Sequence, residues 1–324
     1  IFTKKKRTRQ TMRILITGGG GFIGTKMIKR LTDHHSPEKI IVLDNFIEQV
    51  HGKEEPKYID GVDYVIGDVS DIDCWDEAMS YNPQLIIHLA SETGTGQSME
   101  EISRYVKTNV LGTAIMLEIL NTRKHNVKKV ILSSSRSVYG DGENIETNFS
   151  LDPVSVYALT KLDQEKLIHI SCPVPYTIYR YQNAYGPGQS IKNPYTGIIS
   201  IFSEKFSNGE TIDIWDNGEP TRDFIYVEDI VSATLLSIDN PKTDYKTYNV
   251  GTGQAVPILE VTKKLKDLIN PDCDINITDY HRPGDIMHAY GNIDKISNEL
   301  NWKPKFTLEQ GLSNFAKWFK EQKI

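Results

Sequence analysis

The stretch "ILITGGGGFIG", residues 14–24, runs from an apolar segment into a helix-like one. Gly18, Gly21 and Gly24 stand in a GxxGxxG spacing. The expected helix begins with the apolar residues Phe22 and Ile23. Glycines let the chain turn tightly and approach a pyrophosphate, and the helix N-terminus offers free N–H groups to the phosphates. The stretch therefore predicts a strand–turn–helix unit that binds a dinucleotide.

The same alternation continues along the chain. Apolar runs predict strands at 13–17, 40–44, 63–67, 85–90, 130–134 and 177–181. Helical periodicity predicts helices at 22–35, 74–79, 102–125 and 157–170. Several strands are apolar on both faces, which is typical of a parallel sheet covered on both sides. The fold class is therefore α/β, a doubly wound parallel sheet of the Rossmann type.

After residue 181 the regularity ends in long segments rich in Gly, Pro and Asn. The stretch at 247–253, "TYNVGTG", predicts one more strand that returns to the sheet. We therefore expect a dinucleotide-binding domain from 12–181 and 226–253. A smaller, discontinuous, mixed α/β substrate domain is expected from 182–225 and 254–324, with the ligand site in the crevice between the two.

Composition narrows the class of protein. The 324 residues carry a net charge of −6, although residues 1–11 alone hold five basic side chains and no acid. The acidic remainder argues against nucleic-acid binding, and we expect 1–11 to be an extension. Three scattered cysteines, no membrane-length apolar run and no metal-ligand histidine spacing predict a soluble, cytoplasmic protein without a metal.

Asp44 and Asn45 end the second strand, about 20 residues after the glycines. A carboxylate at Asp44 accepts hydrogen bonds from the ribose hydroxyls of adenosine and repels a 2′-phosphate, which favours NAD over NADP. Asp68 and Val69 end the third strand. They either hold the adenine edge, or Asp68 caps the following helix.

Two further motifs carry chemistry. Tyr157 and Lys161 are four residues apart in a predicted helix and therefore share a face. A nearby ammonium group favours the phenolate, so we expect it to lower the pKa of Tyr157 and make this side chain a usable base. The second motif is "SSSRSVYG", residues 133–140, at the end of a strand.

These motifs together resemble the extended short-chain dehydrogenases/reductases of the nucleotide-sugar epimerase/dehydratase group. They occur in family order with "HLAS" (88–91), "TNVLGT" (108–113), "RYQNAYGPG" (180–188), "RDFIYVEDI" (222–230), "YNVGTG" (248–253) and "RPGDI" (282–286). The resemblance covers essentially residue 12 to the C-terminus. One departure is Gln182, where galactose epimerases carry an aromatic residue.

The resemblance implies the role of individual residues. Ser135, Tyr157 and Lys161 are the implied catalytic triad. Cofactor contacts are implied for the glycine-rich turn and for Asp44, Asn45, Asp68, Val69, Leu89, Ala90, Ser91, Asn109, Tyr157 and Lys161. Substrate contacts are implied for Thr93, Ser135, Arg136, Asn183, Arg222, Arg282 and Ala289. Ala289 stands where a larger residue narrows the sugar pocket in some galactose epimerases.

The residues after Ser135 select the reaction. The 4,6-dehydratases of this family carry Asp and Glu there, whereas this chain has Arg136 and Ser137. A guanidinium group stays charged and is a poor acid or base, which disfavours dehydration. Arg136 either braces a substrate hydroxyl or the closing loop, or forms a surface ion pair. The resemblance then implies NAD-dependent 4-epimerisation of a nucleotide-diphosphate sugar through a transient 4-keto sugar.

Loops at 44–52, 92–99 and 185–198 are more similar to those of dTDP-L-rhamnose 4-epimerases, which interconvert dTDP-L-rhamnose and dTDP-6-deoxy-L-talose. A UDP-glucose/UDP-galactose 4-epimerase and a nucleotide 4-ketosugar reductase remain open as alternatives. A non-enzymatic dinucleotide sensor is disfavoured, because a sensor need not keep all three triad residues. We expect a homodimer that binds neither nucleic acid nor a membrane.

Overall fold

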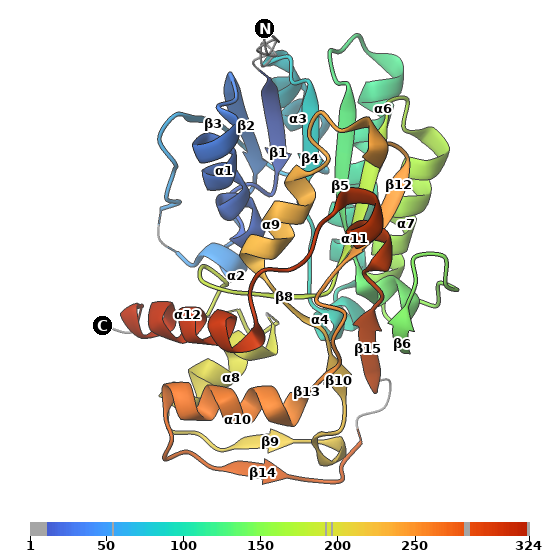
Figure 1. The fold of residues 1–324 in the computed structure, drawn as a ribbon. Coiled ribbons are helices and arrows are strands. Elements are labelled where there is room, and N and C mark those ends of the chain that lie inside the picture. Colours follow the sequence, from blue (N-terminus) through green and yellow to red (C-terminus); the bar gives the residue numbers. More distant parts are fainter. Residues whose placement is uncertain (1–11, 54, 192, 196, 282–285, 323–324) are drawn as a thin grey trace, which may run out of the picture.

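A computed structural model describes residues 12–53, 55–191, 193–195, 197–281 and 286–322. Its centre is a seven-stranded parallel sheet in the order β12-β7-β5-β4-β1-β2-β3 (Figure 1). The strands are β1 (Arg13–Thr17), β2 (Lys39–Asp44), β3 (Val62–Ile66), β4 (Leu85–His88), β5 (Lys129–Ser135), β7 (Tyr176–Tyr181) and β12 (Lys246–Val250). The order reverses between β1 and β4, and ligands of such sheets bind outside the carboxyl ends of the strands at that point.

Helices cover both faces of the sheet because alternate strand residues point to opposite sides. On one face α1 (Phe22–His35), α9 (Val227–Leu235) and α11 (Asp294–Leu300) pack against residues such as Ile14 and Ile16. On the other face α3 (Ile72–Ser80), α6 (Gly112–Thr122) and α7 (Val156–Ser171) enclose Leu15 and Ile86. The doubly wound fold predicted from the sequence is confirmed.

The C-terminal part forms a smaller body below the carboxyl edge of the sheet (Figure 1). Its helices are α8 (Ile198–Ser207), α10 (Ile258–Ile269) and α12 (Leu308–Glu321), which share a core with β9 (Ile212–Ile214) and β11 (Phe224–Tyr226). Short sheets complete it: β9 pairs with β14 (Ile275–Ile277), β11 pairs with β8 (Asn183–Tyr185), and β10 (Thr221–Arg222), β13 (Val256–Pro257), β15 (His288–Gly291) and β6 (Gly142–Ile145) form the third.

Most predicted elements agree with the structure within two or three residues. The returning strand expected at 247–253 is β12, which pairs in parallel with β7. The helix expected at 102–125 is found at 102–122, and it consists of α5 (Ile102–Tyr105), a π-helical segment at Val106–Leu111 and α6. Thr108 and Asn109 of this π-helical segment are buried.

The expected extension, residues 1–11, lies outside the described part of the chain. Two short helices follow strand ends near the cavity described below, namely α2 (Glu48–His51) and α4 (Thr95–Glu100). Among the described residues no helix is both long and apolar enough to cross a membrane.

Candidate functional site

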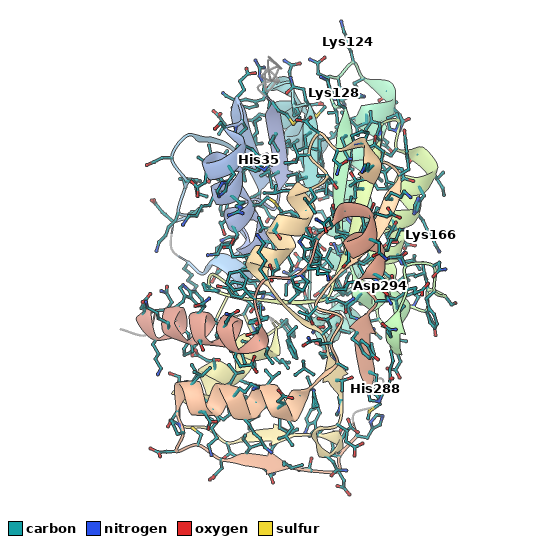
Figure 2. All side chains as sticks on the ribbon, in the orientation of Figure 1. His35, Lys124, Lys128, Lys166, His288 and Asp294 are labelled. Atoms are coloured by element: carbon teal, nitrogen blue, oxygen red, sulfur yellow. The ribbon has the colours of Figure 1, made fainter. Side chains whose placement is uncertain are left out.

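A cavity of about 1060 Å³ lies at the carboxyl edge of the sheet and continues along the C-terminal body. Lys124 and Lys128, which precede β5, lie at the opposite end of the molecule (Figure 2). The wall holds Gly18, Gly21, Phe22, Ile23, Gly24, Asp44, Asn45, Val69, Leu89, Ala90, Ser91, Thr93, Ser135, Arg136, Tyr157, Lys161, Asn183 and Arg222. The structure thus brings most of the sequence-predicted site residues to one cavity.

The glycine-rich turn forms one end of this cavity. Gly18 has φ +67°, and a Cβ there would lie 2.7 Å from the backbone nitrogen of Ala90. A Cβ on Gly24 would lie 2.5 Å from the Gly18 carbonyl oxygen, so the helix and the turn touch through backbone. No side chain caps the N-terminus of α1. Its first N–H groups therefore suit an anionic group, and this end fits the pyrophosphate of a dinucleotide.

Asp44 is held in place beside that turn. Its two carboxylate oxygens accept hydrogen bonds from the backbone N–H groups of Gly20 and Phe46, each at 2.9 Å. These bonds keep the carboxylate, which is mostly buried, on the cavity wall at the end of β2. The fixed negative charge suits ribose hydroxyls and disfavours a phosphate at the same position.

Asp68 does not line the cavity, in contrast to the predicted cofactor contact. Its carboxylate turns back and accepts hydrogen bonds from the N–H group (2.8 Å) and the hydroxyl (2.7 Å) of Ser70. The alternative role as a helix cap is also wrong, because the N-cap of α3 is Asp71. Asp68 instead accepts a hydrogen bond from the amide of Asn45 at 3.2 Å, so it supports a residue of the wall.

Asn109 also lies behind the wall, since its side chain is fully buried by protein. Its amide oxygen accepts hydrogen bonds from the Glu92 N–H (2.8 Å) and the Ser91 hydroxyl (3.0 Å). Its amide nitrogen donates to the Glu92 carbonyl (3.2 Å) and the Thr160 hydroxyl (3.0 Å). Asn109 therefore ties the segment after β4 to α7 and positions wall residues, rather than contacting the cofactor itself.

His88 fixes the end of β4 from within the sheet. Burial, with a smaller contribution from Lys161, lowers its pKa to about 3, so the ring is neutral. Thr113 donates its hydroxyl proton to the Asn109 carbonyl and accepts from Gln164, so the His88 Nε2 at 3.1 Å must be the donor. The Nδ1 then accepts from the Thr17 hydroxyl at 2.7 Å.

The three predicted catalytic residues meet at the carboxyl end of β5. Ser155 caps α7 by accepting a hydrogen bond from the Ala158 N–H at 3.1 Å, which places Tyr157 in the first turn. The Tyr157 hydroxyl is hydrogen-bonded to Ser135. One turn later, the buried ammonium group of Lys161 donates to the Ser133 carbonyl oxygen at 3.0 Å. A hydroxyl, a phenol and an ammonium group thus share one short stretch of wall.

Burial dominates the protonation of this group. It raises the pKa of Tyr157, and the hydrogen bond from Ser135 only opposes this effect. The lowering of the Tyr157 pKa that the sequence led us to expect is therefore not found. Burial lowers the pKa of Lys161 to about 7, against the attraction of the Glu165 carboxylate. Lys161 is thus poised to gain or lose its charge near neutral pH.

A buried ion pair supports this stretch from behind. Glu165 on α7 accepts hydrogen bonds from the Arg180 Nε (2.9 Å), the Arg180 Nη2 (2.6 Å) and the Ser134 hydroxyl (2.5 Å). Arg180 also donates to the Tyr139 hydroxyl at 2.7 Å. Because both charges are satisfied, the pair locks α7, β5 and β7 in one arrangement.

The substrate side of the cavity matches the prediction in part. Thr93, Asn183 and Arg222 lie on the wall, and Arg222 donates to the Thr221 and Met287 carbonyl oxygens at 2.8 and 3.3 Å. Ala289 does not line the cavity, because it is fully buried in β15, paired with Arg222 in β10. Arg282 lies outside the described residues.

Arg136 is not part of a surface ion pair. Only 8% of this residue is exposed, and its Nη2 donates a hydrogen bond to the Gly140 carbonyl oxygen. Burial, together with repulsion from Arg222, lowers its pKa to about 10. The alternative of a surface ion pair is therefore wrong, and Arg136 is one of the residues of the cavity wall.

Three amide side chains and one arginine that the sequence analysis did not identify link four segments around the cavity. Gln49 on α2 exchanges hydrogen bonds with Gln97 on α4, at 2.9 and 3.0 Å. It also donates to Asn193 (3.2 Å) and accepts from Arg104 (3.0 Å). We call these four residues the amide cluster.

Sequence reasoning missed the supporting residues because no short spacing marks them. Gln49 and Asn193 are 144 positions apart, and Glu165 and Arg180 are on different elements. Among the described residues, no group of three or more His, Cys, Asp or Glu side chains is arranged to hold a metal ion.

Comparisons with known proteins agree with this geometry. Residues 14–251 match the model of the NAD dependent epimerase/dehydratase family. A dTDP-L-rhamnose 4-epimerase from Burkholderia thailandensis is 32% identical, over 96% of this chain and 95% of its own. A putative UDP-glucose 4-epimerase from Methanocaldococcus jannaschii is also 32% identical, over 95% and 98%. The structure of UDP-glucose 4-epimerase from Thermus thermophilus in complex with NAD superposes with a TM-score of 0.84, at 27% identity, over 95% of this chain and 99% of that one.

Proposed function

The chain belongs to the NAD dependent epimerase/dehydratase family, and on that premise we propose that it interconverts dTDP-L-rhamnose and dTDP-6-deoxy-L-talose. It is an NAD-dependent nucleotide-sugar 4-epimerase. The observation that carries the chemistry is the joint position of Ser135, Tyr157 and Lys161 on the wall of a cavity that begins at the glycine-rich turn. The relative from Burkholderia thailandensis and the loops similar to that subgroup support the choice of sugar.

The residues of this chain divide the chemistry between them. NAD, when bound, supplies the hydride acceptor and donor at the reacting carbon. Tyr157 removes the proton of the C4 hydroxyl and later returns it to the oxygen of the 4-keto sugar. Ser135 holds that oxygen by a hydrogen bond, and the Lys161 ammonium group stabilises the phenolate that forms on Tyr157.

The other cavity residues would bind and orient. In this proposal Asp44 and Asn45 bind the adenosine ribose, and Gly18, Gly21 and the start of α1 bind the pyrophosphate of NAD. Val69, Leu89, Ala90 and Ser91 line the cofactor. Thr93, Asn183 and Arg222 contact the nucleotide sugar, together with Arg282. The segments 12–181 and 226–253 would act as the NAD-binding domain. The segments 182–225 and 254–324 would act as the substrate domain, except that α11 within the last segment packs on the central sheet.

A second substrate is favoured by a specific observation. The putative UDP-glucose 4-epimerase is as similar to this chain as the rhamnose enzyme, so a UDP-hexose is the main alternative. A 4-ketosugar reductase would use the same triad but would release its cofactor in each cycle.

A homodimer and a cytoplasmic location are part of the proposal. Apolar side chains are exposed along adjoining helices, at Met99, Ile102, Val106 and Leu111 and at Leu159 on α7. Such a stripe suits the same stripe of a second copy. The three free cysteines are consistent with a reducing compartment. Light scattering of the wild type and of Ile102→Glu tests the dimer.

The reaction is tested by incubating the pure protein with dTDP-L-rhamnose, UDP-glucose, UDP-galactose and UDP-glucuronate, without added cofactor. NMR resolves the products, and the absorbance of reduced nicotinamide is followed in parallel. We expect a mixture of the two dTDP-sugars with no net change in absorbance. If only a UDP-sugar is converted, that UDP-sugar is the substrate in place of dTDP-L-rhamnose. If turnover requires a 4-keto sugar and a stoichiometric amount of reduced cofactor, the protein is a reductase and not an epimerase.

A further inference from the structure

Arg136 carries a buried charge that has no ion-pair partner among the described residues. Its hydrogen-bond partner is the Gly140 carbonyl oxygen, although a guanidinium group has five N–H donors. The ion pairs found among the described residues, such as those of Lys129 and Arg180, do not include Arg136. Burying a charge without a counter-ion is strongly unfavourable.

Among the charged neighbours of Arg136, the one with the largest effect adds to this imbalance. Arg222 repels it from β10, and burial and this repulsion together lower the pKa of Arg136. Asp141 attracts it, but one oxygen of that carboxylate already accepts a hydrogen bond from the His288 N–H at 2.8 Å. His288 lies on β15 at the side of the molecule (Figure 2), so this oxygen of Asp141 faces β15.

Position in the chain decides which part of a ligand Arg136 can reach. It directly follows Ser135 and opens the 3-10 turn Arg136–Tyr139, so it lies on the wall beside the catalytic hydroxyl. The pairing of β10 with β15, and of β15 with β6, brings Arg222 to the same part of the wall. Two arginine residues whose charges repel each other thus line the same cavity as Ser135.

We propose that Arg136, together with Arg222, forms an oxyanion-binding site, and that Arg136 binds a negatively charged group of the substrate close to Ser135. The proposal rests on the proposed nucleotide-sugar function and deepens it. A nucleotide sugar offers two groups of this chemistry, the phosphate next to the sugar and, in a uronic acid, the sugar carboxylate. Either oxyanion matches the planar fork of a guanidinium group.

The experiment measures ligand affinity by calorimetry on the NAD-loaded protein, in the wild type and in Arg136→Met. The probes are dTDP and UDP, the nucleosides thymidine and uridine, and the pair UDP-glucuronate and UDP-glucose. Arg123→Met is the matched control, because it removes the same group from an exposed ion pair with Asp76. A lost charge-assisted hydrogen bond should weaken binding about 10- to 100-fold.

Each result has a defined meaning. If Arg136→Met weakens the binding of dTDP or UDP but leaves the binding of the nucleosides unchanged, the oxyanion is a phosphate. If the variant binds dTDP and UDP as the wild type does, but its affinity for UDP-glucuronate falls more than its affinity for UDP-glucose, the oxyanion is a carboxylate. If all affinities equal those of the wild type and of Arg123→Met, the proposal is overturned.

A structural role through Gly140 is separated by Arg136→Lys. This variant keeps the charge, so anion binding predicts an affinity between those of the wild type and Arg136→Met, with a steeper dependence on salt. A purely structural role predicts that both variants lose bound NAD and thermal stability alike, and that outcome overturns the proposal.

The same measurements distinguish a failure of the proposed function from a failure of the oxyanion-binding site. If the wild type binds diphosphates in an Arg136-dependent manner but epimerises no sugar, the function fails and the oxyanion site stands. If the wild type binds none of the nucleotides, the function fails. The site is then tested by the thermal shift that inorganic pyrophosphate causes. A shift lost in Arg136→Met supports the site, and an equal shift in both overturns it.

Discussion

Ser134 and Ser135 are neighbours at the end of β5, but their hydroxyl groups have separate partners. The Ser134 hydroxyl donates to the buried Glu165 carboxylate at 2.5 Å. The Ser135 oxygen accepts from the Ser137 N–H at 3.1 Å, and it meets Tyr157 at the cavity. Successive strand residues point to opposite faces, so one serine supports the fold while the next one faces the reaction.

Tyr157→Phe should abolish most of the activity and leave the fold intact. The substitution removes the hydroxyl that accepts the C4 proton, and general base catalysis contributes roughly 10²- to 10⁴-fold. The variant should keep its bound NAD and its melting temperature, which are measured beside the rate of epimerisation. A variant that retains more than a tenth of the wild-type rate would show that another group is the base.

The three serines should separate into three phenotypes. Ser135→Ala should lower the rate by less than Tyr157→Phe, because Ser135 orients the oxygen without accepting its proton. Ser133→Ala should leave the rate nearly unchanged. Ser134→Ala should mainly lower the free energy of unfolding, by about 1–3 kcal/mol, since Glu165 loses a buried partner. Equal losses of activity in Ser133→Ala and Ser135→Ala would contradict the assignment of Ser135.

Asp44→Ala should narrow the preference for NAD over NADP. The wild-type carboxylate is fixed by the N–H groups of Gly20 and Phe46, so it cannot swing away from a 2′-phosphate. Protein denatured after purification should release NAD(H), and the two dissociation constants are compared in wild type and variant. Recovery of NADP(H) from the native protein would contradict this role of Asp44.

His88 should contribute to acid unfolding. Its pKa is about 3 in the folded protein because of burial, against 6.5 in the unfolded chain. The unfolded chain therefore binds a proton first, and stability present above pH 6.5 is lost as the pH falls toward 3. The loss is on the order of 3 kcal/mol between pH 6.5 and 4.

The test compares the free energy of unfolding of the wild type and of His88→Gln across this range. The difference between the two should shrink as the pH falls, while contributions common to both proteins cancel. The exposed His34 is replaced in the same way as a control. A difference that does not change with pH would mean that His88 is already protonated in the folded state.

The local parts of the fold and site could be predicted from the sequence. The strands, the turn at Gly18–Gly24 and the Tyr157–Lys161 pair each depend on spacings within one element. Apolar runs, glycines and the i, i+4 relation are visible in a short window. The π-helical segment at Val106–Leu111 is not, because its apolar pattern differs little from that of an α-helix.

Side-chain direction and long-range partners were the harder parts. Asp68 turns onto Ser70, a local side-chain hydrogen bond that competes with any ligand contact and that the D-x-S spacing could have indicated. Ala289 was misplaced because the face of a strand is known only when its pairing register is known. Asn109, Glu165 and Gln49 act through partners from distant segments, and only the folded chain brings these together.

The amide cluster joins segments that contribute residues to the cavity wall. Gln49 makes four hydrogen bonds with α4, α5 and the segment after β8, and each of these regions is next to wall residues. Gln97 and Asn193 are themselves buried. If Gln49 were apolar, both amides would lose a partner, at a cost of about 1–3 kcal/mol for each group.

Gln49→Leu should therefore weaken the binding of NAD without changing the catalytic groups. We expect NAD to dissociate about tenfold faster or more, since each 1.4 kcal/mol corresponds to a factor of ten. The NAD content after gel filtration and the activation by added NAD measure this effect. Glu48→Gln is the control, because Glu48 is the exposed neighbour of Gln49 and pairs only with the exposed Lys53 in the described part of the chain.

With saturating NAD, the Gln49→Leu rate should return to that of the wild type, because Ser135, Tyr157 and Lys161 are unchanged. Retention of NAD equal to that of Glu48→Gln would show that the cluster does not hold the cofactor.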